Sequence, residues 1–134
     1  MNRRAFLALS TACALPWAGE AHAFVDHSYA PAKWRELQNS DQTVVLFFRA
    51  DWSLTCQIKE EIIARLIAEN PRYENLTFLD IDWDTFGASR MTEGLRVSRR
   101  STLVVMKQGR EIARLENEPH EDKLRALLET AMAA

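Results

Sequence analysis

One stretch, residues 44–68, constrains the fold of this chain more than any other. It opens with a continuous apolar run, Val44 to Phe48, which is rich in β-branched and aromatic residues and predicts a buried central strand. The polar segment that follows, Arg49 to Thr55, predicts a turn. From Cys56 onward the apolar residues recur at helical spacing. The stretch therefore predicts a strand, a tight turn and a helix with a cysteine in its first turn.

The predicted helix has an apolar stripe and a polar face. Ile58, Ile62 and Leu66 recur every four positions, and the charged residues between them are Lys59, Glu60, Glu61 and Arg65. The N-terminal amides of a helix and its macrodipole favour a thiolate in the first turn. Cys56 is therefore a candidate reactive thiol.

Residues 48–60, FRADWSLTCQIKE, resemble the active-site segment of the thioredoxin family, where Ala-x-Trp precedes Cys-x-x-Cys-Lys. The segment is most similar to the thioredoxin-like domain of bacterial periplasmic disulfide reductases. Ala50, Asp51, Trp52 and Cys56 match, whereas the family's first, attacking cysteine falls on Ser53. The resemblance implies an α/β fold of the thioredoxin type, with a central mixed sheet flanked by helices.

The rest of the chain favours the same topology. Residues 24–31 have no periodicity and predict an irregular surface segment. After it we expect a helix over 32–37, a second strand over 76–82, one short helix over 84–94, a hairpin of strands 102–107 and 110–116, and a final helix with Pro119 in its first turn. Helices that alternate with strands indicate parallel pairing, and the hairpin adds an antiparallel edge.

The resemblance also implies which parts of dithiol exchange are missing. That reaction needs an attacking cysteine and a second cysteine that resolves the mixed disulfide, and a serine in the first position is a poor nucleophile without an adjacent base. The family's buried acid falls on Phe47, and its cis-proline falls on Ser101. A cis bond before a residue other than proline costs roughly 2.5–4 kcal/mol, so we expect either a trans Arg100–Ser101 bond or a strained exception. We predict that dithiol exchange has been lost.

Two functions follow from this pattern. The first is a module that binds an unidentified protein or extended peptide in thiol–disulfide homeostasis. Cys56 would then be a small buried residue or the site of a trapped mixed disulfide. The candidate binding residues are those of the turn and of the loop before the third strand: Trp52, Arg49, Arg99, Ser101 and Thr102.

The second function is a thiol enzyme that uses Cys56 alone, for peroxidase-like chemistry or for monothiol exchange. Arg49, Arg99 and Arg100 would converge on the helix N-terminus, and Arg100 is the candidate stabiliser of the thiolate. Ser53-x-x-Cys56 also resembles the Thr/Ser-x-x-Cys motif of peroxiredoxins, although the proline that opens that motif falls on Arg49.

The first 23 residues predict an export signal, which leaves a domain over residues 24–134. Arg3-Arg4 precedes an apolar run of about 14 residues, too short to span a bilayer, and Ala21-His22-Ala23 is a small-x-small cleavage pattern. Residues 2–7, NRRAFL, also resemble the twin-arginine export motif, and ordinary Sec export is the alternative. Both routes lead to the bacterial periplasm. Cleavage would remove Cys13 and leave Cys56 as the only cysteine.

Charge and spacing argue against other classes of function. The net charge of −2 gives no basic imbalance for nucleic acid or for an anionic membrane. The histidines show no metal-ligand spacing, and we expect no metal and no cofactor. Asp80, Asp82 and Asp84 predict a face of solvated carboxylates, and Trp34 and Trp83 predict core or edge positions.

Overall fold

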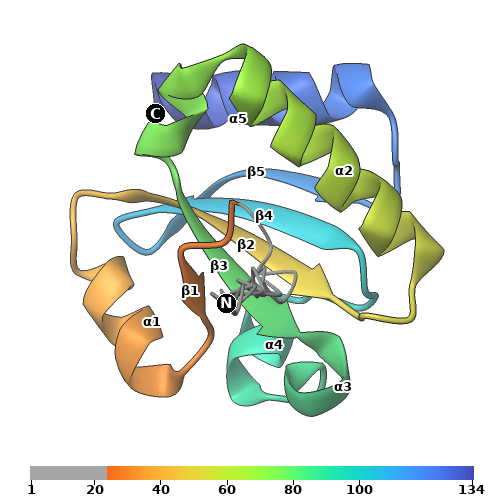
Figure 1. The fold of residues 1–134 in the computed structure, drawn as a ribbon. Coiled ribbons are helices and arrows are strands. Elements are labelled where there is room, and N and C mark those ends of the chain that lie inside the picture. Colours follow the sequence, from red (N-terminus) through yellow and green to blue (C-terminus); the bar gives the residue numbers. More distant parts are fainter. Residues whose placement is uncertain (1–23) are drawn as a thin grey trace, which may run out of the picture.

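The computed structural model of this chain describes residues 24–134 (Figure 1). The predicted export signal lies outside the described residues. Among residues 24–134, no helix is long and apolar enough to cross a membrane.

The central strand of the sheet is β2, Thr43–Arg49, and all of its residues after Thr43 are buried. It runs parallel to β3, Thr77–Asp82, and antiparallel to β4, Thr102–Lys107. The two edges are β1, His27–Ser28, which is parallel to β3, and β5, Arg110–Glu116, which is antiparallel to β4. The order β1-β3-β2-β4-β5 gives the predicted central mixed sheet.

Helices cover both faces of this sheet (Figure 1). On one face lie α2, Leu54–Glu69, and α5, Glu121–Ala133; the short 3-10 helix η1, Pro71–Asn75, follows α2. On the other face lie α1, Pro31–Gln38, α3, Trp83–Phe86, and α4, Arg90–Gly94. The sheet therefore has a separate apolar core on each side.

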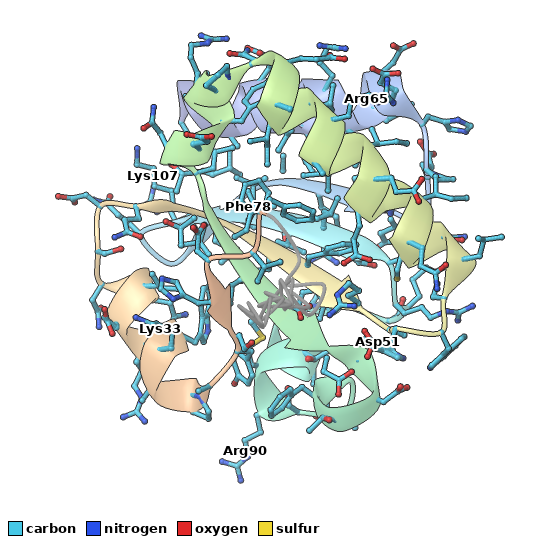
Figure 2. All side chains as sticks on the ribbon, in the orientation of Figure 1. Lys33, Asp51, Arg65, Phe78, Arg90 and Lys107 are labelled. Atoms are coloured by element: carbon cyan, nitrogen blue, oxygen red, sulfur yellow. The ribbon has the colours of Figure 1, made fainter. Side chains whose placement is uncertain are left out.

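Alternation along β2 divides its side chains between the two cores. Val45 and Phe47 pack with α2 and α5, in the same cluster as Cys56 and Phe78. Figure 2 shows Phe78 between the sheet and these helices. Val44, Leu46 and Phe48 pack with α1 on the opposite face, in a cluster that also holds Trp34 and borders Trp83. The residue aligned with the family's buried acid, Phe47, is thus an ordinary core side chain.

Three local predictions were wrong. The segment 24–31 contains strand β1, because Asp26 N donates to Phe78 O at 3.2 Å and Tyr29 N donates to Asp80 O at 2.8 Å. A strand of two residues is too short to show periodicity. The helix expected over 84–94 is two helices, with Gly87 between them and Ser89 capping the second at 3.3 Å from Thr92 N. The last helix begins at Glu121, which leaves Pro119 outside it.

Candidate functional site

The turn between β2 and α2 is held by the backbone and by one serine. Ser53 N donates to Ala50 O at 3.1 Å, and Ser53 is the N-cap residue of α2. Its Oγ accepts a hydrogen bond of 3.4 Å from Cys56 N. A capping hydroxyl satisfies one of the helix's unpaired N–H groups, so the hydroxyl of Ser53 is engaged in the start of the helix.

Cys56 lies in the first turn of α2 as predicted, and it is completely buried as a free thiol. Ser53 is also buried, at 3% exposure. Trp52 and Leu54, on either side of Ser53, are exposed. The thiol is therefore shielded from solvent in the folded chain.

Lys59, one helical turn after Cys56, is a buried charged residue that the sequence analysis did not single out. It is completely buried, and its Nζ donates a short hydrogen bond to the carbonyl oxygen of Ser101. Burial lowers the pKa of Lys59 to about 8, against the opposing effect of the acidic groups Cys56 and Glu118. Cys56, Lys59, Ile63 and Leu66 are the buried residues of α2. Their spacing of three, four and three residues is typical of one helix face. The stripe of Ile58, Ile62 and Leu66, on which the sequence analysis relied, marks a different face.

Ser101 is the centre of the loop that precedes β4. No peptide bond among residues 24–134 is cis, so the Arg100–Ser101 bond is trans. Ser101 has a φ of 61°, in the left-handed region that is unfavourable for a residue with a side chain. Its N–H donates to Phe48 O at 2.7 Å, and its carbonyl accepts from both Lys59 Nζ and Asn117 N. These bonds hold the strained residue in place.

Arg49 does not take part in the arrangement that the sequence predicted. Its guanidinium makes two hydrogen bonds to Asp80, of 3.0 and 2.7 Å, and it also contacts Asp51 and Glu60. Burial works against its charge, but Asp80 and the other carboxylates outweigh that effect and raise the pKa of Arg49. Asp80 is therefore an ion-pair partner in the interior and not a solvated carboxylate.

Trp52 lies on the surface beside Arg100. The guanidinium carbon of Arg100 is 4.4 Å from the centre of the indole ring, and Trp52 Nε1 donates to the carboxylate of Asp84 at 3.0 Å. The ring is thus fixed from two sides while 60% of the side chain stays exposed. Arg49 pairs with carboxylates, and Arg100 covers Trp52, the residue before the N-cap of α2. The convergence of the arginines on the helix N-terminus stays a prediction.

The structure divides the predicted site residues into a buried group and an exposed group. Ser53, Cys56, Ser101 and Thr102 are buried with Arg49. Thr102 Oγ1 donates to Arg99 O at 2.8 Å. The exposed residues are Trp52, Arg99 and Arg100. Within residues 24–134, no group of three or more His, Cys, Asp or Glu residues could hold a metal ion.

Comparisons with known proteins agree with this geometry. The family model for thioredoxin matches residues 27–130. The chain belongs to the thioredoxin family. This membership and the fold indicate a function related to thiol–disulfide chemistry. A search of curated proteins found no match.

Solved thioredoxin structures are similar over most of their length. Trxlp from Edwardsiella tarda EIB202 has 28% identity and a TM-score of 0.68, covering 76% of this chain and 96% of that chain. Thioredoxin Mala s 13 from Malassezia sympodialis has 18% identity and a TM-score of 0.67, covering 79% and 92%. Thioredoxin from Trypanosoma brucei brucei has 20% identity and a TM-score of 0.62, covering 83% and 96%.

The buried lysine predicts a specific dependence of stability on pH. The pKa of Lys59 is about 8 in the folded chain and 10.5 without perturbation, so between these values the unfolded state binds more protons. The contribution of Lys59 to the free energy of unfolding should therefore rise across this interval. Urea denaturation should be measured from pH 7 to pH 10. Over this range the free energy of unfolding of Lys59→Met should fall by on the order of 2 kcal/mol relative to that of the wild type.

Two comparisons control this measurement. A relative loss at least as large should appear in a Cys56→Ala background, where the thiol no longer titrates and no longer favours the charged form of Lys59. Lys33→Met makes the same chemical change on an exposed face of α1 and should run parallel to the wild type. A Lys59→Met profile parallel to the wild type would mean that the lysine is solvated.

Proposed function

We propose that this protein is an exported thioredoxin-like module that lacks the dithiol active site and binds a protein or an extended peptide in the periplasm. Residues 1–23 would be its export signal. The observation that carries the proposal is the pair of large apolar side chains exposed at the start of α2: Trp52, in the turn before it, at 60% and Leu54, its first residue, at 68%. Among residues 24–134 the third exposed large apolar side chain, Ile112, is on β5.

The surface around Trp52 has the composition of a recognition site. Tryptophan and arginine are the residues most enriched among those that dominate binding energy at interfaces. Arg99 and Arg100 are both exposed, and in the part of the chain described here neither has a carboxylate within 4 Å. The contacts of Trp52 with Arg100 and Asp84 fix the ring before a partner arrives, which reduces the entropy lost on binding. We propose Trp52, Leu54, Arg99 and Arg100 as the binding surface.

The loss of dithiol exchange follows from the role of Ser53. The hydroxyl of Ser53 caps α2 and cannot replace the attacking thiol of the family. The thiol of Cys56 is buried. The second candidate function, a thiol enzyme that uses Cys56 alone, is favoured by one observation: a buried lysine lies one helical turn from the thiol. This candidate requires that the turn opens to admit a substrate.

The proposal predicts no turnover of the wild-type chain in an insulin-reduction assay. Ser53→Cys restores a Cys-x-x-Cys pair at the start of α2, so on oxidation it should form an intramolecular disulfide, and it should gain measurable insulin reduction. Ser53→Ala is the matched control: it removes the hydroxyl, adds no thiol and should stay inactive. Robust turnover by the wild type would sink the proposal.

Binding should depend on Trp52. A reduced and S-alkylated protein that stays extended is a suitable probe, because it offers a peptide chain without free thiols. The wild type should bind it saturably, and Trp52→Ala should weaken binding about tenfold or more, as expected for a central aromatic contact.

Ile112→Ala is the control for this experiment, since it truncates an exposed large apolar side chain on β5. It should leave the affinity unchanged. Equal losses in Trp52→Ala and Ile112→Ala, or no binding by the wild type, would contradict the proposed surface.

A further inference from the structure

We propose that Lys59 activates Cys56: its ammonium group pairs with the Cys56 thiolate, and this thiolate attacks a disulfide of the bound partner. The inference rests on the proposed binding function, because the partner must first open the turn above Cys56. It assigns to Lys59 the role that the sequence analysis gave to Arg100, and it names a disulfide-bearing protein as the class of substrate.

The position of Lys59 carries the argument. Cys56 and Lys59 are three residues apart on α2, and both are completely buried on the same face of the helix. Residues at this spacing are neighbours on a helix. An ammonium group in the interior has few ways to offset its loss of solvation, and a nearby anion is the most effective one.

Few charged or polar groups face the ammonium of Lys59. Cys56 comes from α2, and Glu118 comes from the segment between β5 and α5. Glu118 also lies 3.5 Å from Lys123 Nζ, which partly satisfies its charge. The loop before β4 supplies the carbonyl of Ser101. Among the groups on α2, Cys56 is the one whose anion favours the charged form of Lys59.

The hydroxyl of Ser101 provides a second, independent observation at this site. Ser101 is completely buried, and its Oγ has no hydrogen-bond partner within the described part of the chain. A buried unpaired hydroxyl is costly, and groups of this kind require an explanation. It belongs to the residue whose carbonyl accepts the hydrogen bond of Lys59, so the site holds a buried donor that no group of the described chain uses.

Two of the arginines, Arg49 and Arg100, are engaged by other groups in the structure. Arg49 is engaged by Asp80, Asp51 and Glu60, and the guanidinium of Arg100 covers the ring of Trp52.

Electrostatic coupling between Cys56 and Lys59 is reciprocal. The thiolate of Cys56 favours the charged form of Lys59, so the ammonium must favour the thiolate equally.

The step balances without an additional oxidant. The thiol of Cys56 gives its proton to solvent, while Lys59 keeps its own. The thiolate attacks one sulfur of the partner's disulfide, that S–S bond breaks, and a new one forms between Cys56 and the partner. The departing partner thiolate takes a proton from solvent. Residue 53 is a serine and supplies no second thiol, so the mixed disulfide persists.

The test is a titration of the thiolate by its ultraviolet absorbance, which does not require a reagent to enter the core. The full chain is used, and the spectrum of Cys56→Ala is subtracted so that Cys13 and the tyrosines cancel. Lys59→Met should raise the midpoint of thiolate formation by about one pH unit or more. At pH values well below the midpoint, this shift lowers the fraction of thiolate about tenfold. Lys59→Arg, which keeps the positive charge, should recover most of the difference.

Two results would overturn the inference. One is a midpoint that Lys59→Met leaves unchanged, and the other is a midpoint that Arg100→Ala raises as much as Lys59→Met does. Lys33→Met is the matched control and should have no effect, because Lys33 lies on α1 and pairs with Glu36.

A second measurement covers the case in which Lys59→Met fails to fold. The side-chain carbon signals of labelled Lys59 are followed by NMR against pH in the wild type and in Cys56→Ala. Because the thiolate favours the ammonium, Cys56→Ala should lower the midpoint for Lys59, and an unchanged midpoint would contradict the coupling. Both titrations are independent of the peptide-binding assay. Failure of the probe to bind would remove the proposed function, and unchanged midpoints would remove only the role of Lys59.

Discussion

The hydrogen bond from Lys59 to the carbonyl of Ser101 holds the candidate site together. It joins the first turns of α2 to the loop before β4, two segments that are far apart in the sequence. A charged donor makes a stronger bond than a neutral one, and here it lies in the interior, where water does not compete. The left-handed backbone of Ser101, which costs roughly 1–3 kcal/mol, persists because this bond and two backbone bonds fix the residue.

Two properties of Cys56, its accessibility and its ionisation, depend on different parts of the site. The thiol is inaccessible in the folded chain, where Ala50, Ser53 and Cys56 are buried while Trp52 and Leu54 are exposed. Ionisation of the thiol is governed by the groups around it in the core, of which Lys59 is the charged one on the same helix face. A chain with this arrangement can keep a thiol inert toward solvent and still release it to a partner that opens the turn. The exposed Trp52 is where we expect that partner to bind.

Much of the fold could be predicted from the sequence because its signals were strong and local. The apolar run Val44 to Phe48 and the helical spacing after Cys56 predicted β2 and α2, and the resemblance to thioredoxins supplied the order of the other strands. Strand β1 could not be found this way, because its two residues are extended only through pairing with β3. The break between α3 and α4 was missed because a short helical pattern does not show where a glycine ends it.

The site was less predictable than the fold, since it depends on contacts between distant residues. The expected fold suggested that the arginines converge on the N-terminus of α2. Arg49 instead pairs with Asp80 on the neighbouring strand, a partner 31 residues away that β2–β3 pairing brings beside it. Lysine in a helix is normally a solvated residue, so the sequence pattern did not single out Lys59. Its burial follows from the position of Ser101, 42 residues later, which no local pattern reveals.

The most direct test of this account is the rate at which a small alkylating reagent modifies Cys56 in the folded chain and in the same chain unfolded by urea. The account holds that the turn shields the thiol, since Cys56 has 0% exposure. It therefore predicts alkylation at least about a hundredfold slower in the folded chain, the factor expected when reaction requires a local opening that costs about 3 kcal/mol. Equal rates in the two states would contradict the account, because the thiol would then be accessible and a partner would not be needed to release it.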